Sequence, residues 1–256
     1  MIDLVTDIHP PLARVTINRP DRRNAISNTM WQELEAIAAR LNDDPTIKIT
    51  VITGAGDAAF SAGADIIEMQ QGLADPQRMK VMQQAVLDAQ VAWERLPMPT
   101  LAVIRGACTG GGCGLALACD LRLATPDAFF AIPPARLGLA YSLADTKRLQ
   151  DLVGPSRTKE ILYTGRRIVA AEALELGLIN EIVAAEALDE RAVALAREIT
   201  DNAGNSVRAA KAVVNMITAG VITETPESRR HYDESFSSAE FLEGTRAFIE
   251  KRRPRF

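Results

Sequence analysis

Hydrophobic and polar positions alternate in several short segments of the first half of the chain. In residues 12–18, Ala13, Val15 and Ile17 fall on one side, a period of two that predicts a β-strand. Residues 47–53 are rich in β-branched side chains and predict a second strand. Short apolar segments predict three more strands, at 101–104, 121–124 and 128–132.

A helical period follows the first strand. Four apolar residues recur at spacings of three and four and form one stripe: Met30, Leu34, Ile37 and Leu41. Ser27 or Asn28 can cap this helix, and Asp44-Pro45 ends it. The pattern predicts another amphipathic helix over 77–95 and a short apolar helix after the glycines at 110–112.

Beyond about residue 145 the pattern becomes almost wholly helical. Helices are predicted near 145–153, 155–163, 170–176, 186–202, 206–219, 226–237 and 239–252. Strands, helices and glycine loops alternate first, and helices fill the rest. We therefore predict an α/β protein with a core over residues 1–195 and a C-terminal helical region over residues 196–256.

Composition excludes several classes of protein. The chain has 256 residues, of which 47% are hydrophobic and 24% charged, so it can bury a sizeable core and disorder is not expected. Its net charge of −4 provides no basic field that would recruit nucleic acid or a membrane surface. No stretch of about 18 uninterrupted apolar residues predicts a transmembrane helix. The first residues lack the pattern of a signal peptide.

The cysteines and histidines do not indicate a disulfide framework or a metal site. Cys108, Cys113 and Cys119 form an odd, closely spaced set in an apolar neighbourhood, which is typical of small buried thiols. The two histidines, His9 and His231, stand at opposite ends of the chain, so we expect no zinc site. Reduced cysteines fit a cytoplasmic location.

Two glycine-rich loops are the first candidates for chemistry. GAGDAAFSAGAD, residues 54–65, and TGGGCG, residues 109–114, each follow a predicted strand. Glycine allows backbone N–H groups to face a ligand closely, although each loop alone could equally be a tight turn. Neither loop matches a nucleotide-binding motif. Together they could form an oxyanion hole, a pair of N–H donors that stabilises developing negative charge.

The sequence resembles the enoyl-CoA hydratase/isomerase (crotonase) family. The resemblance is carried by NRPDRRNAIS at 18–27, FSAGADIIEM at 60–69, RGACTGGGCGLALACDLRLA at 105–124 and EGTRAFIEKRRPRF at 243–256, in the same order over nearly the whole chain. It implies a spiral of β-β-α repeats with a C-terminal helical trimerisation region. It also implies an acyl-CoA thioester substrate, no separate cofactor, and a homotrimer or dimer of trimers.

The resemblance assigns roles to individual residues. Ala64 and Gly111 fall where the family supplies the two N–H groups of its oxyanion hole. Seven further residues fall at positions that contact substrate or coenzyme A: Ala25, Ala62, Asp65, Ile66, Ile67, Phe248 and Lys251. Of these, Phe248 and Lys251 match positions that reach the coenzyme A of a neighbouring subunit.

The chain departs from the family where acid–base groups are expected. Hydratases of the family use two glutamates, and the matching positions hold Gly114 and Pro134. Neither residue can transfer a proton. Some relatives place an aspartate where this chain has Ser142, and Asp145 lies three residues on, where it is predicted to cap a helix.

An oxyanion hole without these glutamates favours decarboxylase-like or isomerase-like chemistry. RLGLAYSLAD at 136–145 resembles a segment of methylmalonyl-CoA decarboxylases of the family, which makes Tyr141 a candidate to touch the acyl group. An ordinary half-buried tyrosine bonded to backbone is an equal alternative. Two other functions stay open, an enoyl-CoA hydratase with weak or altered activity in fatty-acid or branched-acyl degradation and a non-catalytic acyl-CoA-binding protein.

Other polar residues near these motifs have simpler structural interpretations. Asp65 is predicted to cap a helix, and Glu68 to lie on a solvated helix face. Arg136 is expected to be a structural ion-pair partner. Ser61 has no nearby histidine, so a catalytic triad is not expected. The basic C-terminal segment at 251–255 is expected to be a solvated tail near the coenzyme A phosphates.

Overall fold

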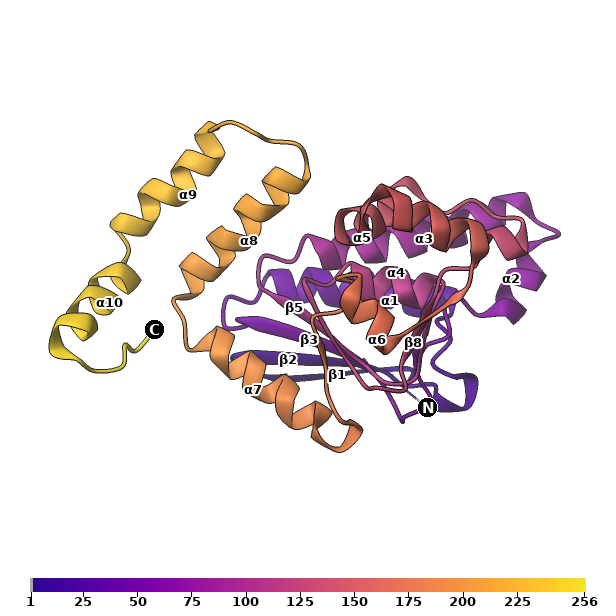
Figure 1. Ribbon diagram of the computed structural model, residues 1–256, viewed down its shortest axis with the longest axis horizontal. Helices are drawn as coiled ribbons and strands as arrows, with labels where there is room; N and C mark the ends of the chain where they lie inside the picture. The colour runs from indigo at the N-terminus through magenta and orange to yellow at the C-terminus, as the bar shows by residue number, and fades with distance from the viewer. Residues whose placement is uncertain (1) are drawn as a thin grey trace.

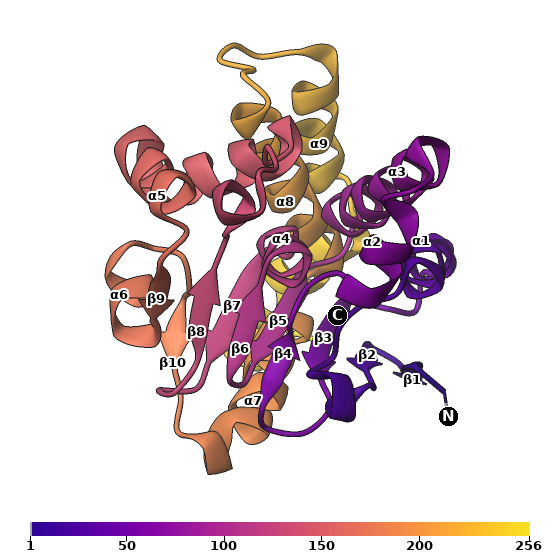
Figure 2. The same ribbon diagram turned by 90° about the vertical axis from the view of Figure 1, so that its right-hand side faces the viewer.

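The computed structural model describes residues 2–256, which form two twisted sheets surrounded by helices (Figures 1 and 2). The larger sheet has the strand order β1-β2-β3-β5-β7-β10 and the smaller one the order β4-β6-β8-β9. Strands of the larger sheet are β1 Leu4–His9, β2 Leu12–Ile17, β3 Ile49–Gly54, β5 Thr100–Ile104, β7 Leu121–Ala124 and β10 Glu181–Ile182. Those of the smaller sheet are β4 Ala59–Ser61, β6 Ala107–Thr109, β8 Phe129–Ala131 and β9 Arg167–Val169.

The chain passes repeatedly from the larger sheet to the smaller one and then into a helix. β3 is followed by β4, β5 by β6 and β7 by β8, and each pair leads into helical structure. Within the larger sheet, β2, β3, β5, β7 and β10 pair in parallel, and only β1 is antiparallel to its neighbour. The predicted β-β-α repeats are therefore present. Because the repeats stack in parallel, each turn of the spiral ends at the same edge of the sheets.

Ten α-helices accompany the strands within residues 2–256. Their bounds are α1 Asn28–Asn42, α2 Ile66–Gly72, α3 Pro76–Glu94, α4 Gly111–Leu117, α5 Leu143–Thr164, α6 Ala170–Glu175, α7 Leu188–Thr200, α8 Gly204–Thr218, α9 Pro226–Phe236 and α10 Ala239–Glu250. Ser27 caps α1 by accepting a hydrogen bond from the Met30 N–H. The predicted stripe of Met30, Leu34, Ile37 and Leu41 is buried, as its spacing required.

Two hydrophobic cores flank the larger sheet. The main core joins α1, α3 and α4 to the inner strands and includes the two tryptophans Trp31 and Trp93. A smaller core lies between the other face of the sheet and α7, where Val51, Leu101 and Leu188 pack together. Figure 1 shows α7 on one side of the sheet and α1, α3 and α4 on the other. Both faces of the central strands are thus buried, which explains their continuous apolar sequences.

Several details differ from the predictions. β1 was not predicted, and neither were β4, β9 and β10, which have three, three and two residues and are too short to display a period. The predicted helices at 145–153 and 155–163 are both present, as the two parts of α5, which are separated by Gly154 with the non-helical angles φ 77° and ψ 166°. The predicted boundary at residue 195 falls inside α7, and the division into two regions stays a prediction.

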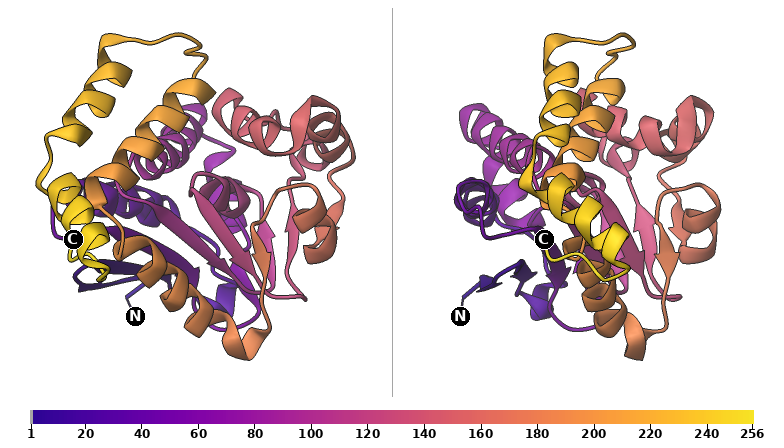
Figure 3. Two further views of the ribbon diagram at one scale, coloured as in Figure 1. Left: turned by 60° about the vertical axis from the view of Figure 1, so that its left-hand side comes forward. Right: turned by 90° about the vertical axis from the view of Figure 1, so that its left-hand side faces the viewer.

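The last three helices extend away from the body of the molecule (Figures 1 and 3). α8 and α9 pack against each other, and α10 follows at the far end. These helices expose many large apolar side chains: Val214, Ile217, Tyr232, Phe236, Phe241, Leu242, Phe248 and Ile249. A protruding helical region with exposed apolar side chains is what an association surface requires.

The three cysteines are buried free thiols, as predicted. Burial raises the pKa of Cys119 to about 12, so this thiol stays protonated and is inert at neutral pH. Within residues 2–256, no helix combines the length and the apolar character needed to cross a membrane.

Candidate active site

The two glycine-rich loops meet at the end of the smaller sheet. Gly63 has φ +93°, and a Cβ added to it would lie 3.3 Å from the Gly111 nitrogen and 2.9 Å from the Thr109 carbonyl oxygen. A Cβ added to Gly111 would lie 3.9 Å from the Ala64 nitrogen. The loops are therefore in van der Waals contact, and only glycine at position 63 permits both this φ and this approach.

The N–H groups of Ala64 and Gly111 are left available by the bonds around them. On one loop the neighbouring N–H groups of Gly63 and Asp65 donate to Ser61 Oγ and the Ile26 carbonyl. On the other, the Gly110 N–H donates to the Ala131 carbonyl and Gly111 begins α4. Among the hydrogen bonds of residues 2–256, neither the Ala64 nor the Gly111 N–H donates to a protein acceptor. Both residues are half-buried.

A third segment, residues 23–27, supports the first loop. The Ala62 N–H donates to the Arg23 carbonyl at 2.9 Å, and the Ile26 N–H donates to the Gly63 carbonyl at 2.8 Å. Ser61 Oγ donates to the Asn24 carbonyl at 2.9 Å, so Ser61 fixes the loop to this segment. These bonds bring Ala25 and Ala62 close to Ala64.

Asn24 is a residue of this segment that the sequence reasoning did not identify. It is fully buried and adopts φ 56°. Its Nδ2 donates to the carbonyls of Ala55 and Ala59, and its Oδ1 accepts from the Arg19 N–H. Asparagine tolerates this left-handed conformation better than most residues and satisfies three backbone groups at once. The sequence could have indicated this role, because Asn24 follows a run of polar residues that is typical of a turn.

Asp65 caps α2, as its position predicted. Its carboxylate accepts from the Ile67 N–H at 3.0 Å and pairs with Arg19 at 3.1 Å. Ile66 and Ile67 are exposed at the start of α2. The prediction for Glu68 was wrong, because Glu68 Oε2 accepts from the Asn28 N–H at 2.7 Å. Glu68 thus satisfies a free N–H at the start of α1 and ties α2 to α1.

An apolar cavity of about 120 Å³ opens beside Ala64. Its lining is rich in apolar side chains: Ile26, Trp31, Met69, Met79, Met82, Val86 and Leu139. Two buried polar atoms of the lining, Asn28 Oδ1 and Trp31 Nε1, have no hydrogen-bond partner among residues 2–256. Methionine side chains are flexible and adapt to irregular ligands. The cavity can hold a short apolar group whose polar end reaches Ala64.

Gly114 lies one turn along α4 from Gly111 and faces a buried polar cluster. A Cβ added to Gly114 would lie 2.7 Å from Asp145 Oδ1 and would also collide with Gln90 Nε2. Gln90 Nε2 donates to the Gly111 carbonyl at 3.3 Å. The space beside position 114 is therefore filled by two polar side chains from α3 and α5.

We expect Gly114→Ala to lower the free energy of unfolding by about 1–3 kcal/mol, because the new methyl group must displace the Asp145 carboxyl and the Gln90 amide. Urea unfolding followed by circular dichroism measures this change. Gly244→Ala is the matched control, since a Cβ there meets nothing closer than 3.6 Å. It should be neutral or slightly stabilising, as expected for alanine in a helix. A Gly114→Ala protein as stable as the control would contradict the close packing of Asp145.

Asp145 does not cap α5, contrary to the prediction. Ser142 is the cap, because its Oγ accepts from the Asp145 N–H at 3.0 Å while donating to Asp145 Oδ2 at 2.7 Å. Asp145 is only 7% exposed and pairs with Arg148 Nη1 at 3.2 Å. Burial raises the pKa of Asp145, although the bonds from Ser142 and Arg148 and the positive charge of Arg148 oppose the shift.

Tyr141 lies next to this cluster. Its ring packs against the main core, and its hydroxyl oxygen is buried without a hydrogen-bond partner among residues 2–256. The alternative in which the Tyr141 hydroxyl is hydrogen-bonded to the backbone is therefore wrong. Burial, followed by the charge of Asp145 and the proximity of Cys113, raises the pKa of Tyr141 well above its ordinary value. The hydroxyl is thus a neutral donor facing Asp145 and α4.

Pro134 and Arg136 lie on the short 3₁₀ turn Pro134–Leu137. Arg136 was expected to form an ion pair, but its Nε instead donates to the Thr164 carbonyl at 3.2 Å. Its role is structural, through a backbone acceptor. No carboxylate stands at position 134 to face Gly114 across the site.

Phe248 and Lys251 are not brought to the other candidate residues within one chain. Phe248 is 86% exposed on α10, and Lys251 ends that helix with φ 54°. Figure 1 shows α10 at the opposite end of the molecule from α2.

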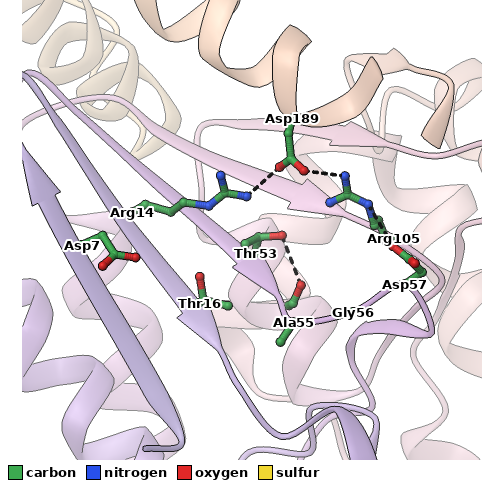
Figure 4. A pocket seen from close by; sticks show the side chains of 10 residues that line it. Asp7, Arg14, Thr16, Thr53, Ala55, Gly56, Asp57, Arg105 and Asp189 are labelled. Carbon is green, nitrogen blue, oxygen red and sulfur yellow. Dashed lines mark hydrogen bonds and ion pairs between the residues drawn. The ribbon is translucent and has the colours of Figure 1, made fainter. Parts of the chain in front are cut away.

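A second, polar cleft lies under α7 and is separate from the apolar cavity (Figure 4). Asp189 bridges Arg14 at 2.6 Å and Arg105 at 2.8 Å, and Arg105 also pairs with Asp57 at 3.4 Å. Burial raises the pKa of Asp189, but its bond to Arg14 and the charge of Arg105 lower it by more. Since the arginines are neutralised by carboxylates, this cleft is an ion-pair cluster that joins α7 to the sheet.

Comparisons with known proteins agree with this architecture. The family model described as enoyl-CoA hydratase/isomerase matches residues 7–256. A crotonyl-CoA hydratase of Syntrophomonas wolfei is 34% identical over 259 residues, covering 99% of this chain and 97% of its own length. A short-chain-enoyl-CoA hydratase of Clostridium acetobutylicum is 32% identical over 244 residues, covering 94% of this chain and 92% of its own.

The solved structures agree with the sequence relatives. An enoyl-CoA hydratase/isomerase family protein of Hyphomonas neptunium superposes with a TM-score of 0.96 at 41% identity, covering 100% of this chain and 97% of that one. The chain therefore belongs to the enoyl-CoA hydratase/isomerase family of acyl-CoA-processing enzymes. The predicted family and its α/β fold of β-β-α repeats are confirmed.

Proposed function

We propose that this chain binds an acyl-CoA thioester and stabilises its enolate with the N–H groups of Ala64 and Gly111. The observation that carries the proposal is the meeting of these two groups, from separate loops, with no acceptor for either among residues 2–256. A thioester oxygen that gains negative charge needs two such donors. Each donor of an oxyanion hole contributes roughly 3–4 kcal/mol to transition-state stabilisation.

The acyl group would occupy the apolar cavity beside Ala64. Its volume of about 120 Å³ and its methionine-rich lining suit a short, uncharged acyl chain. The thioester would then lie at the mouth of the cavity, within reach of both N–H groups. Ala25, Ala62 and the exposed Ile66 and Ile67 would border this position and contact the pantetheine and the start of the acyl group.

The helical region would complete the binding site by association of subunits. Phe248 lies on α10 and Lys251 ends it, and α10 is at the opposite end of the molecule from α2 (Figure 1), so these two residues would contact coenzyme A bound to a neighbour. The apolar side chains exposed on α8–α10 would form the contact surface of a homotrimer or a dimer of trimers. Sedimentation of the full chain tests this part, since a stable monomer at micromolar concentration would contradict it.

The reaction would be isomerase-like or decarboxylase-like. Hydration requires one group that activates water and another that handles the α-proton, and Gly114 and Pro134 provide neither. Decarboxylation generates the enolate directly, because the electron pair of the C–C bond passes into the thioester as CO₂ leaves. Isomerisation moves one proton between two carbons of the acyl chain. Tyr141 would orient the acyl group as a neutral donor.

The names of the relatives favour a second candidate, an enoyl-CoA hydratase with weak or altered activity. The matched relatives of Syntrophomonas wolfei and Clostridium acetobutylicum are both named hydratases. A binding protein without turnover is the third outcome that an assay must separate. These alternatives share the thioester site and differ only in the groups that move protons.

We expect the wild-type protein to hydrate crotonyl-CoA at least ~100-fold more slowly than a relative with both glutamates, the smallest loss typical of removing acid–base groups. Methylmalonyl-CoA and trans-3-hexenoyl-CoA, assayed in parallel by chromatography, report decarboxylation and isomerisation. Turnover of either with little hydration supports the proposal. Hydration at the relative's rate would establish the hydratase, and tight binding without turnover would establish a binding protein.

A further inference from the structure

We propose that Asp145 is the catalytic carboxyl of this chain, which carries a proton between carbons of the bound acyl thioester from the place that a family glutamate would occupy. The inference rests on the proposed thioester site. It adds a named proton carrier, and it selects isomerisation, or exchange of the α-proton, as the reaction.

The position of the carboxyl is the first argument. Asp145 Oδ1 lies 2.7 Å from where a Cβ of residue 114 would be, which is within the length of a glutamate side chain. Asp145 therefore fills the volume that a glutamate at position 114 would fill, reaching it from α5 instead of α4. The glycine at 114 is then a requirement of this arrangement, because any Cβ there would collide with the carboxyl.

The closeness of this cluster to the two N–H groups is the second argument. Gly111 and Gly114 are three residues apart on α4, a spacing that places their Cα atoms about 5–6 Å apart on one helix face. Gln90 joins the two positions, since its Nε2 donates to the Gly111 carbonyl while its Oε1 accepts from Arg148 at 3.3 Å. A thioester oxygen held at the Gly111 N–H would therefore lie one turn of α4 away from the position that Asp145 faces.

The hydrogen bonds around Asp145 suit a group that both takes and returns a proton. Ser142 Oγ donates to Oδ2, and Arg148 donates to Oδ1. Arg148 is shared between two carboxylates, because its Nη2 donates to Glu94 at 2.7 Å. Burial raises the pKa of Asp145, and Glu94 adds to the shift. A carboxyl with a raised pKa is a stronger base and returns its proton more readily near neutral pH.

An unused polar group points to the same place. The Tyr141 hydroxyl is buried without a partner among residues 2–256, and it lies close enough to Asp145 for the carboxylate charge to affect its pKa. A buried hydroxyl without a partner costs roughly 1–3 kcal/mol. A bound ligand that accepts a hydrogen bond from the Tyr141 hydroxyl would offset this cost.

The chemical step balances with this single carboxyl. The Asp145 carboxylate takes a proton from the α-carbon of a 3-enoyl thioester. The C–H bond breaks, its electron pair enters the carbon chain, and the carbonyl π pair moves to the thioester oxygen held by Ala64 and Gly111. The dienolate then takes the proton back at the α- or γ-carbon, which restores the carboxylate. No water, oxidant or second carboxyl is consumed, so one aspartate suffices where hydration would need two groups.

Deuterium exchange and isomerisation test the proposal. Wild-type protein in D₂O is incubated with butyryl-CoA for α-proton exchange, followed by NMR, and with trans-3-hexenoyl-CoA for conversion to the 2-enoyl thioester. We expect both reactions, and we expect Asp145→Asn to slow both by about 10²–10⁴-fold with butyryl-CoA affinity unchanged. The control is Glu94→Gln, which removes the other carboxylate from Arg148 but leaves Asp145 in place.

The pH profile supplies a measurement that does not depend on the folding of Asp145→Asn. The charged and titratable groups around Asp145 are Arg148 from α5, Glu94 from α3 and Tyr141 from the preceding loop. Asp145 is the base, so the rate should rise with pH through its pKa. Since Glu94 raises that pKa, Glu94→Gln should shift the rising limb to lower pH while the plateau rate stays within a few fold.

The outcomes separate this inference from the proposed function. Loss of exchange in Asp145→Asn, with binding retained and the shifted limb in Glu94→Gln, supports the assignment. Full exchange in Asp145→Asn overturns it, as does an unshifted limb. Wild-type protein that binds butyryl-CoA without any exchange also overturns it and leaves the thioester site standing. Wild-type protein that binds no acyl thioester overturns the proposed function itself.

Discussion

Ala64→Pro is expected to lower the turnover of a thioester substrate by about 10²–10³-fold, the loss typical of removing one donor from an oxyanion hole. Proline has no N–H, and the Ala64 N–H donates to no acceptor among residues 2–256, so the substitution removes no hydrogen bond of the fold. Steady-state kinetics with trans-3-hexenoyl-CoA measures the effect, which should be larger on kcat than on KM.

Ala64→Gly is the matched control for this prediction. It retains the N–H and removes only the methyl group, so turnover should stay within a few fold of the wild type. A thermal melt of both variants checks that the loop keeps its position between residues 23–27 and 110–111. Equal turnover in a folded Ala64→Pro protein would show that the Ala64 N–H does not contact the thioester oxygen.

Arg122→Met is expected to cost roughly 3–5 kcal/mol of unfolding free energy, because several buried carbonyl groups lose their donor together. Arg122 lies on β7 and is 3% exposed. Its guanidinium donates to the carbonyls of Leu178 at 2.8 Å and Cys119 at 2.6 Å, and more weakly to those of Ala116 and Asp120. The side chain therefore joins the end of α4 to the segment before β10.

A thermal melt measures this loss as a decrease in Tm of about 6–20 °C, given roughly 2–4 °C per kcal/mol for a chain of this size. Arg191→Met is the control, since Arg191 forms half-exposed pairs with Glu181 and Glu198, each at 3.0 Å. Such pairs contribute about 0–1 kcal/mol. An Arg122→Met protein that melts with the control would contradict the role of these carbonyl bonds.

Local periodicity predicted the elements that are long enough to display it. The alternation over 12–18 and the stripe from Met30 to Leu41 both correspond to observed elements, β2 and α1. β1 was not predicted because it is an edge strand. Its residues are mostly half-buried or exposed, so its two faces differ little in burial. β9 and β10 were missed because two or three residues contain no period.

Predictions for polar side chains were right where the hydrogen-bond partner lies nearby in the sequence and wrong where it lies on another element. Asp65 caps α2 because its acceptor role involves only the next two residues. Glu68 was assigned to a solvated face, yet it accepts from Asn28 on another helix, a partner that no local pattern contains. Arg136 likewise donates to the distant Thr164 carbonyl and forms no ion pair within residues 2–256. Contacts between elements are set by packing, which a single sequence does not display.

The sequence by itself determined the family, the β-β-α repeats and the two glycine loops, because glycine spacing and apolar periods are local properties of the chain. It also showed that Gly114 and Pro134 cannot transfer protons. Only the tertiary structure decided that the loops of Ala64 and Gly111 are in contact and that Asp145 fills the space beside Gly114. Those placements depend on how separate turns of the spiral stack, and a packed core fixes such distances to within less than a methyl group.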